Sequence, residues 1–445
     1  MKNQIIKLCF IFAMFQVICF FNYSNFAQQV ELESLKSDSE IAEAVRQSGD
    51  NEKALKLFND IILRRPKFFA PYYSRALIFI SQGKFDLAIK DLTKAIQFQP
   101  DSVILYHYRG ICHANLDNYE LAANDFGMVI KLDPKELSGY ANRASINQRY
   151  GRHDLAITDF TKAIELKPDD WIFYISRGIS YLALEKTALA VADFTKTIEL
   201  NPKAEMAYLY RGQIYLETDK IDLALADANK MIETEPATIS GFAFRGDCYL
   251  KLEKYQSALK DYDKVIRQAP DYPGIFIQRS FLFFKLEDFE GLINESTKAI
   301  EKNPYDAMTY NNRAYGYLRL NQLPKAEADI NKSLSLNPYF SLALNNRGLL
   351  RIMQNKLSLA LIDIEKARKI DPNIPEIYLN RGLLFTAQKL YQKAIIEFDK
   401  AINLAPKLAI AYEKRGETFK LLKEDVKSNA DFEMAKQLRE KVKSL

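Results

Sequence analysis

The feature of this sequence that most limits its fold is a proline that recurs every 34 residues. Each of these prolines follows a helix-like stretch, of which Asp159 to Pro168 (DFTKAIELKP) is an example. A fixed period of about 20 to 50 residues is typical of stacked-repeat proteins, in which each repeat is one supersecondary unit. The prolines in this register are Pro66, Pro100, Pro134, Pro168, Pro202, Pro236, Pro270, Pro304, Pro338, Pro372 and Pro406.

Other positions of the period carry small or aromatic residues. With proline at position 32, repeat 5 has Tyr174 at position 4, Gly178 at position 8 and Ala190 at position 20, and most repeats follow it. A glycine inside a helix costs about 1 kcal/mol of helix propensity. Its recurrence indicates a close helix neighbour, which we expect to be the alanine at position 20. The repeats begin at Leu35, Phe69, Val103, Leu137, Trp171, Glu205, Ile239, Pro273, Ala307, Ser341, Pro375 and Ala409.

This pattern resembles the tetratricopeptide repeat (TPR) family, whose unit pairs a helix A with a helix B through these small and large positions. The resemblance implies an all-α fold, a right-handed α-α superhelix or TPR solenoid of about twelve 34-residue helix-turn-helix repeats over residues 35–442. Ordering one repeat costs about 50 kcal/mol, more than one helical hairpin can recover by burial. The repeats should therefore stack continuously, with no linker domain.

Repeat 8 departs most from the pattern. Ser280 stands at position 8, Leu292 replaces the alanine at position 20, and Ser296 replaces the large residue at position 24. A larger residue at one position must be relieved by a smaller one opposite, or the helices spread. We expect a local irregularity in pitch over residues 276–300. Pro273, at position 1, is expected in the first turn of its helix, where proline is tolerated.

The first 27 residues have the features of an export signal. Lys2 and Lys7 form a basic start, residues 8–21 are apolar except for Gln16, and a polar stretch leads to a cut before Gln28. The apolar run is shorter than the roughly 20 residues that span a bilayer. We expect residues 1–27 to be cleaved, 28–34 to be a short polar lead-in, and 443–445 a tail. The protein would then be periplasmic or extracellular; the alternative is tethering to the membrane by residues 8–21.

Composition and motifs exclude several function classes. The formal charge is +5, without the clustered basic patch that nucleic acid requires, so no nucleic-acid partner is expected. The three histidines lack metal-site spacing, and no phosphate loop or serine elbow occurs. We expect no enzyme activity, cofactor or metal.

Two cysteines lie in the repeats, Cys112 and Cys248. They stand at position 10 of repeats that are four apart, which is too distant for a disulfide, and we interpret them as buried core residues.

Two charged positions recur in register. Arginine stands at position 7 and an acid at position 23 in every repeat from the second onward, which predicts a structural ladder of ion pairs between helices A and B of the same or adjacent repeats. The arginines are Arg75, Arg109, Arg143, Arg177, Arg211, Arg245, Arg279, Arg313, Arg347, Arg381 and Arg415. The acids are Asp91, Asp125, Asp159, Asp193, Asp227, Asp261, Glu295, Asp329, Asp363, Glu397 and Asp431.

The family resemblance places positions 2, 5, 6, 9, 12 and 13 of helix A on a concave groove. Asparagines there are similar to the ladder of the O-GlcNAc transferase superhelix and could hold an extended peptide through its backbone; the alternative is that asparagine is simply common at position 6. The asparagines are Asn142, Asn311, Asn312, Asn345, Asn346 and Asn380. Aromatic and apolar candidates, which either bind a partner's side chains or pack between helices A, are Leu209, Tyr210, Phe244, Phe281, Phe284 and Tyr315.

These observations favour an exported, non-enzymatic scaffold that binds a partner protein or an extended peptide in its groove. Two alternatives stay open. One is a membrane-anchored assembly factor, with contact to the membrane only if the N-terminal segment is uncleaved. The other is a non-catalytic targeting subunit of an envelope enzyme complex. The identity of the partner is not specified by the sequence.

Overall fold

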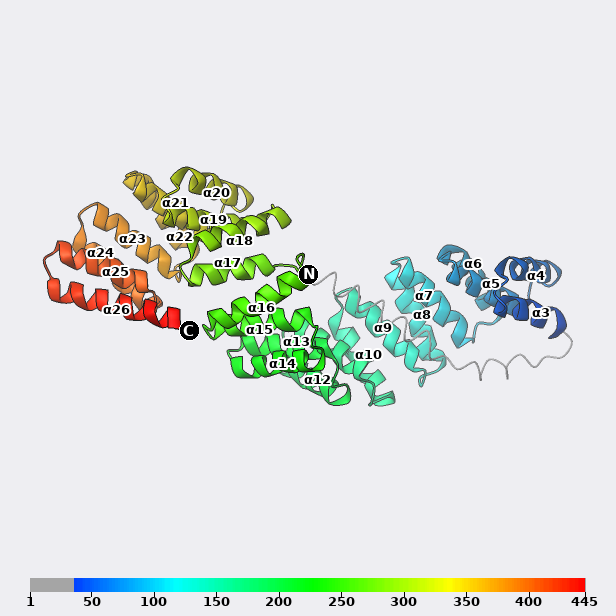
Figure 1. The fold of residues 1–445 in the computed structure, drawn as a ribbon. Coiled ribbons are helices and arrows are strands. Elements are labelled where there is room, and N and C mark those ends of the chain that lie inside the picture. Colours follow the sequence, from blue (N-terminus) through cyan, green and yellow to red (C-terminus); the bar gives the residue numbers. More distant parts are fainter. Residues whose placement is uncertain (1–35, 445) are drawn as a thin grey trace. The chain divides into compact units, whose positions relative to one another are not determined.

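The computed structural model describes residues 36–444, and in that range the regular structure is helical throughout. The predicted signal segment 1–27, the lead-in 28–34 and Leu35 lie outside the described residues. Helices A are α3 (Lys36–Gln47), α5 (Phe69–Ser81), α7 (Val103–Asn115), α9 (Leu137–Arg149), α11 (Trp171–Ala183), α13 (Glu205–Glu217), α15 (Ile239–Lys251), α17 (Ile275–Lys285), α19 (Ala307–Arg319), α21 (Ser341–Met353), α23 (Pro375–Ala387) and α25 (Ala409–Leu421) (Figure 1).

Helices B alternate with them along the chain. They are α4 (Asn51–Arg64), α6 (Phe85–Phe98), α8 (Tyr119–Leu132), α10 (His153–Leu166), α12 (Thr187–Leu200), α14 (Ile221–Thr234), α16 (Tyr255–Gln268), α18 (Phe289–Lys302), α20 (Leu323–Leu336), α22 (Leu357–Ile370), α24 (Tyr391–Leu404) and α26 (Asp425–Ser444). The fold is therefore an all-α array of helix-turn-helix repeats. Residues 443–445 were expected to form a tail after the last helix. Residues 443 and 444 instead continue α26, and Leu445 lies outside the described residues.

The recurring proline ends helix B. Helix α12 stops at Leu200, and Asn201 takes an extended conformation (φ −136°, ψ 91°) before Pro202. The ring of a proline disfavours a helical conformation in the residue before it, and the proline itself has no N–H to donate. The period of 34 residues is thus the period of the helix stops.

The turn from helix A to helix B requires a left-handed residue at position 15. Gly49, Gly83 and Gly151 have φ between 71° and 88° there. Nine repeats place an ordinary side chain in the same conformation, at Asp117, Glu185, Asp219, Glu253, Glu287, Asn321, Asn355, Lys389 and Lys423. Each of these non-glycine residues carries a steric cost that a glycine avoids.

The close approach at position 8 involves the residue at position 24 of the same repeat. A Cβ built on Gly382 would lie 2.4 Å from the ring of Phe398, at position 24 of the same repeat. Gly178 faces Phe194 and Gly246 faces Tyr262 in the same way. The residue at position 24, just past the middle of helix B, is therefore the nearest neighbour of these glycines. The alanine at position 20 also comes close in repeat 10, where the backbone oxygen of Ala360 would lie 3.5 Å from a Cβ on Gly348.

The helices divide into two compact parts, one ending at Thr218 and the other beginning at Asp219. The division lies inside repeat 6, so α13 belongs to the N-terminal part and α14 to the C-terminal part. Within each part, helix B of one repeat packs on helix A of the next, and helices A of neighbouring repeats also touch, as α7 and α9 or α19 and α21 do. We call the surface formed by positions 2, 5, 6, 9, 12 and 13 of these helices the helix-A face.

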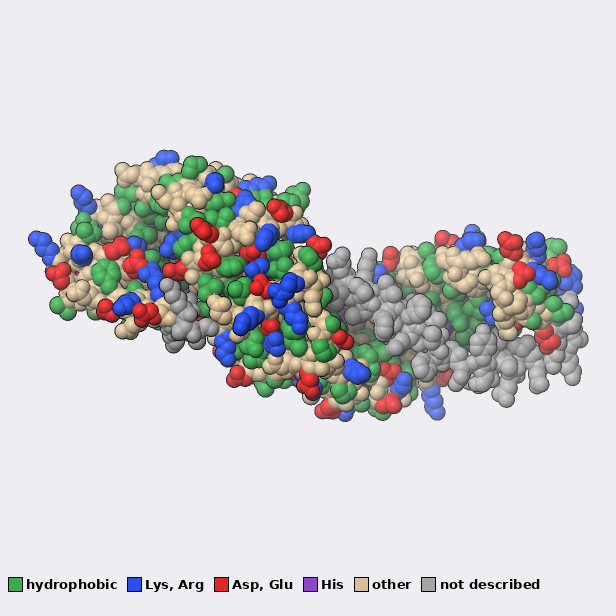
Figure 2. Space-filling view, viewed as in Figure 1, with side chains coloured by type: hydrophobic (Ala, Val, Ile, Leu, Met, Phe, Trp, Pro, Cys, Tyr) green, Lys and Arg blue, Asp and Glu red, His purple; other side chains and the backbone are tan. Residues whose placement is uncertain are grey.

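The core lies between the two helix layers. In repeats 7 and 8, for example, Ala258, Tyr262 and Val265 of α16 pack with Ile275 and Leu282 of α17. Across the C-terminal part, basic and acidic side chains are interspersed on the surface seen in Figure 2. Among the described helices, none has both the length and the apolar character needed to cross a membrane.

Helix A of repeat 8 is shorter than the others. Gly274 has φ 79° and caps α17, which begins only at Ile275, whereas α19 and the other helices A from repeat 2 onward begin at position 1. Pro273 therefore lies before the helix rather than in its first turn, since the left-handed Gly274 interrupts the helical path. Leu292 and Ser296 are both fully buried, so the large and small residues of this repeat share one packed interior.

Candidate functional site

The arginines at position 7 bind the acids at position 23 of the same repeat. In repeat 5, Arg177 Nε and Nη2 donate to the two carboxylate oxygens of Asp193 at 2.8 Å each. This hydrogen bonding raises the pKa of Arg177. The pairs are Arg75–Asp91, Arg109–Asp125, Arg143–Asp159, Arg177–Asp193, Arg245–Asp261, Arg279–Glu295, Arg313–Asp329, Arg347–Asp363, Arg381–Glu397 and Arg415–Asp431.

Most of these arginines also reach back to the preceding repeat. Arg177 Nη1 donates to Thr161 Oγ1 at 3.0 Å, and Thr161 stands at position 25 of repeat 4. Sequence reasoning missed this second partner, whose signal is a polar residue at position 25. The contacts are Arg75–Asn59, Arg109–Thr93, Arg177–Thr161, Arg211–Thr195, Arg245–Asn229, Arg279–Asp263, Arg313–Thr297, Arg381–Glu365 and Arg415–Asp399.

Aromatic rings enclose the same guanidinium groups. Arg177 lies 5.7 Å from the ring centroid of Tyr174, at position 4, and 5.8 Å from that of Tyr181, at position 11. The hydroxyl of Tyr174 donates to the carbonyl oxygen of Pro168 at 3.1 Å, so the ring is tied to the end of the previous repeat. Arg211 is placed similarly between Tyr208 and Tyr215. The charged ladder is thus a structural element that, in most repeats, also binds the repeat before it.

The asparagines of the helix-A face mostly bond to one another. Asn346 Nδ2 donates to Asn311 Oδ1 at 2.8 Å, and Asn380 Nδ2 to the backbone oxygen of Asn345 at 3.3 Å. These contacts join α19, α21 and α23. Asn312 is only partly buried. In the C-terminal part, therefore, most of these amides hold neighbouring helices A together.

Two asparagine atoms are buried without a hydrogen-bond partner among the described residues. They are Nδ2 of Asn142, in α9, and Oδ1 of Asn345, in α21. The side chain of Asn142 is 7% exposed. A buried donor without an acceptor costs about 1–3 kcal/mol, so Asn142 stands apart from the amides that are paired.

The aromatic candidates divide between the interior and the surface. Phe244 is buried, and Tyr210 stacks on Phe194 with ring centroids 5.4 Å apart. Phe281 is 42% exposed and stacks on Phe284, whose ring meets Tyr315 of α19 edge-on at 5.3 Å. Leu209 of α13 is partly buried. The structure therefore brings Phe281, Phe284 and Tyr315 together on the helix-A face of repeats 8 and 9 and leaves Phe281 accessible.

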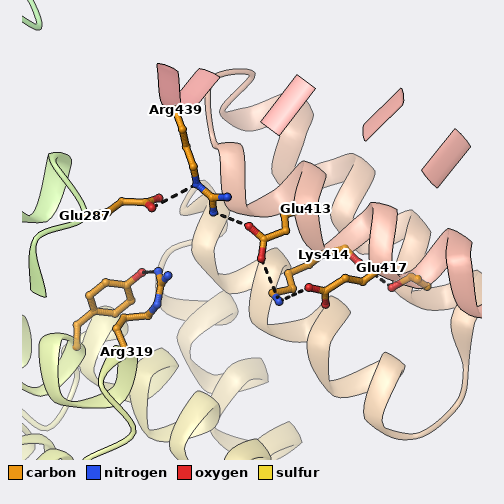
Figure 3. Close-up of polar contacts among 8 residues, drawn as sticks. Glu287, Arg319, Glu413, Lys414, Glu417 and Arg439 are labelled. Carbon is orange, nitrogen blue, oxygen red and sulfur yellow. Dashed lines mark hydrogen bonds and ion pairs between the residues drawn. The ribbon is translucent and has the colours of Figure 1, made fainter. Parts of the chain in front are cut away.

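In the C-terminal part, ion pairs join repeats that are far apart in sequence. Arg439 near the end of α26 lies 3.3 Å from Glu287, in the turn before α18, and donates to Glu413 of α25 at 2.5 Å (Figure 3). Lys407 and Glu253 form a second pair at 2.9 Å. We call these two contacts the end bridges. Glu253 and Glu287 both stand at position 15, but no residue type that recurs in the 34-residue pattern marks their partners, so the sequence did not predict these contacts.

Several buried or partly buried titratable groups lie outside the ladder. Burial lowers the pKa of His107 to about 4, and its Nδ1 lies 3.2 Å from Ser138 Oγ. Burial raises the pKa of Asp247 to about 6, although the Tyr262 hydroxyl donates to its carboxylate at 2.6 Å. Cys112 is free and buried, which raises the pKa of its thiol to about 12.

Neither cysteine is in a disulfide: Cys248, like Cys112, is free and buried, with its pKa raised to about 12. A neutral thiol is a poor nucleophile and metal ligand. Over the described residues, no group of histidine, cysteine and acidic side chains is arranged to hold a metal ion.

These features define a class of protein, the helical-repeat solenoids, in which each two-helix unit is stabilised by its neighbours. Family models described as tetratricopeptide repeat match residues 40–103, 137–170, 175–237, 240–272 and 375–408, just over half of the chain. The chain belongs to the tetratricopeptide repeat family.

A comparison with curated proteins found no match. Among solved structures, the chain is similar to the APC/C hetero-tetramer Cut9–Hcn1, with 15% identity, a TM-score of 0.47, and coverage of 94% of this chain and 98% of that one. It is also similar to a TPR protein from Parabacteroides merdae (19% identity, TM-score 0.46, coverage 56% and 98%). The C-terminal part of a TPR protein from Cytophaga hutchinsonii gives 19% identity, a TM-score of 0.48, and coverage of 54% and 98%.

Proposed function

We propose that this protein is a non-enzymatic scaffold that binds another polypeptide on its helix-A face. Stacked repeats create an extended surface, and such surfaces serve to bind partners. The observation that carries the proposal is the accessible aromatic group on this face, where Phe281 is 42% exposed beside Phe284 and Tyr315. Aromatic side chains with a fixed orientation are strong anchors at protein interfaces.

The surroundings of Phe281 suit a protein partner. Lys285 Nζ lies 5.0 Å from the ring centroid of Phe281, and Arg319 Nη1 donates to the Tyr315 hydroxyl at 2.9 Å. The rings offer apolar contact, while the cations and the hydroxyl offer polar contact at the rim. A combination of an apolar centre and a polar rim is typical of protein interfaces.

Site-specific photo-crosslinking tests this proposal. A benzophenone amino acid replaces Phe281 on the helix-A face or, as a control, Ile362 on α22, which is 61% exposed. Irradiation of expressing cells should join a partner protein to the chain at position 281 and not at position 362. Equal crosslinking at both positions, or none at 281, would contradict the proposal.

We propose further that the protein is exported. The support is the basic start at Lys2 and Lys7 followed by the apolar run of residues 8–21. Sequencing the N-terminus of the protein from the exported fraction should give Gln28 as the first residue. A full-length chain retained with membranes would instead favour the membrane-anchored assembly factor. A crosslinked partner with enzyme activity would favour the targeting subunit.

A further inference from the structure

We propose that the exposed side of helices B in the N-terminal part, centred on α10 of repeat 4, binds a second copy of this chain in an antiparallel, two-fold arrangement. Helices B form the other layer of the array from the helix-A face that carries the proposed function. The inference therefore goes beyond that function. It concerns helices α8, α10 and α12, which all lie in the N-terminal part.

A row of half-exposed leucines lies on these helices. Leu121, Leu155 and Leu189 stand at position 19 of repeats 3, 4 and 5 and are 50%, 54% and 49% exposed. We call them the outer leucine row. Leucine at this position runs from repeat 2 to repeat 6, with Leu155 in the middle, and returns in repeat 10. Stacking does not require it, because lysine stands at the same exposed position in repeats 1, 9, 11 and 12.

Charged side chains of alternating sign lie beside the outer leucine row. Arg152, just before α10, donates from Nη1 to Glu120 Oε2 of α8 at 3.2 Å, and Lys186, just before α12, donates to Asp154 Oδ1 of α10 at 3.4 Å. The order along the turns is therefore Glu120, Arg152, Asp154 and Lys186. The side chains of Glu120 and Asp154 are 61% and 77% exposed, so each carboxylate can accept from a further cation.

This order of charges is complementary to itself when it is reversed. A second copy that lies antiparallel, with its Leu155 against Leu155 of the first copy, brings Arg152 of each copy opposite Asp154 of the other. The same arrangement brings Glu120 of each copy opposite Lys186 of the other. An interface between two copies related by a two-fold axis needs this reciprocal complementarity, and matching charges favour one partner and one register over others.

The interruptions of the charge pattern fit the same arrangement. Repeat 3 has Asn118 in place of a cation at position 16, and repeat 5 has Ala188 in place of an acid at position 18. The antiparallel arrangement places these two uncharged residues opposite each other. It also packs Leu121 of each copy on Leu189 of the other. The leucines and the charges thus share one centre, at the start of α10.

The area of this surface suits a weak dimer. Each of the three helices B has 14 residues. Helices of this length, spaced about 10 Å apart, present about 600 Å² in all. Two copies would bury about 1,200 Å², at the lower end of the range for specific interfaces. We therefore expect a dimer that dissociates at micromolar concentration.

Analytical ultracentrifugation of the full chain, over about 1–200 μM, tests the inference. The wild type should show an equilibrium between monomer and dimer. Leu155→Lys brings two like charges together at the two-fold axis and should raise the dissociation constant at least tenfold. The matched control is Leu359→Lys, at position 19 of repeat 10 in the C-terminal part, where Leu359 is 46% exposed. It should leave the dissociation constant unchanged.

Two complementary variants test the register of the dimer. In Arg152→Glu, and separately in Asp154→Lys, like charges face each other across the axis, so each variant should dimerise at least tenfold more weakly than the wild type. An equimolar mixture of the two variants again places opposite charges together. A heterodimer with nearly the affinity of the wild type should form in this mixture, which also shows that both variants are folded.

Three results would overturn the inference. They are a chain that stays monomeric over the whole concentration range, equal effects of Leu155→Lys and Leu359→Lys, and a mixture of Arg152→Glu and Asp154→Lys that associates no better than either variant alone. Crosslinking at Phe281 is measured on the helix-A face of the C-terminal part, so it reports separately on the proposed scaffold function.

Discussion

At the scale of single residues, the turn at position 15 demands a conformation that most of its occupants tolerate poorly. Every repeat has positive φ there, and only Gly49, Gly83 and Gly151 are glycines. A left-handed conformation costs an ordinary residue about 1–2 kcal/mol. The left-handed geometry at position 15 is therefore kept in every repeat while the side chain varies. Each repeat with a residue other than glycine there is less stable for it.

Replacing Lys389 by glycine should stabilise the chain. Lys389 is exposed with φ 61°, so glycine removes the steric cost at the expense of a more flexible unfolded chain. We expect a gain of about 0.5–1 kcal/mol, seen as a higher melting temperature. The matched control is Lys393→Gly, inside α24 and also exposed, which should cost about 1 kcal/mol. A loss of stability in both Lys389→Gly and Lys393→Gly would contradict the expected strain at position 15.

The buried carboxylate of Asp247 makes stability depend on pH. Its pKa is raised to about 6, above the ordinary value of about 3.9, so its contribution to stability is complete below pH 4 and is lost as the pH rises through 6. Asp247→Asn keeps an acceptor for the Tyr262 hydroxyl. The free energy of unfolding of the variant should equal that of the wild type at pH 4. At pH 8 it should be about 1 kcal/mol larger, a value that allows for the partial exposure of the Asp247 side chain.

Melting temperatures of both proteins between pH 4 and pH 8 check this prediction. Tyr262→Phe provides a further control, since loss of the hydroxyl donor should move the midpoint of the pH dependence upward. A difference between Asp247→Asn and the wild type that stays constant across this range would show that the carboxylate does not titrate as described.

At the scale of helices, most arginines at position 7 join three of them. Arg177 binds Asp193 of α12 in its own repeat and Thr161 of α10 in the repeat before. Asp193 is 5% exposed. Breaking a buried pair by removing one partner costs about 3–5 kcal/mol, whereas replacing both by apolar residues is often nearly neutral.

Arg177→Met should therefore destabilise α11 and α12 by about 3 kcal/mol, because Asp193 is left without its partner. The double variant Arg177→Met with Asp193→Leu should recover most of that loss. Hydrogen exchange of the amides in these helices measures the local free energy of opening. Equal losses in the single and double variants would mean that the pair itself, and not the unpaired acid, provides the stability.

The sequence predicted helices and their pairing far better than the contacts between repeats. The proline at position 32 and the glycine at position 8 mark helix ends and close packing by residue type alone. Position 25 escaped notice because Thr161, Asn229 and Asp399 share only the ability to accept a hydrogen bond. The contact between Gly382 and the Phe398 ring was not predicted, because the reach of that ring depends on helix geometry.

At the scale of the molecule, the division of the chain into two parts falls within repeat 6 and not at a linker. The residues around Thr218 and Asp219 do not predict this division, because the 34-residue pattern continues through repeat 6 unchanged. The end bridges escaped prediction for a similar reason: Glu287 and Arg439 are 152 residues apart in sequence, and only the stacking of the C-terminal part brings them within reach.

The Glu287–Arg439 pair should make the C-terminal part sensitive to salt. Both side chains are partly exposed, and such pairs contribute about 0–1 kcal/mol and are screened by ions. Spin labels at positions 290 and 433 should give a broader and longer distance distribution in Arg439→Gln, and in the wild type at about 1 M salt. Lys436→Gln, on the same helix, is the control. Unchanged distances in Arg439→Gln would show that packing alone holds these repeats.

The backward reach of the position 7 arginines and position 4 tyrosines gives the array a direction. Arg177 donates to Thr161, and Tyr174 donates to Pro168. Both acceptors belong to the preceding repeat, which is synthesised first. A chain emerging from the ribosome can thus complete each new hairpin against one that precedes it. Apart from the end bridges, the arginine and tyrosine contacts of a repeat removed from the C-terminal end are removed together with their donors. Removal of a repeat from the N-terminal end instead leaves the donors of the next repeat without their acceptors. Growth or loss of repeats during evolution should accordingly be tolerated better at the C-terminal side.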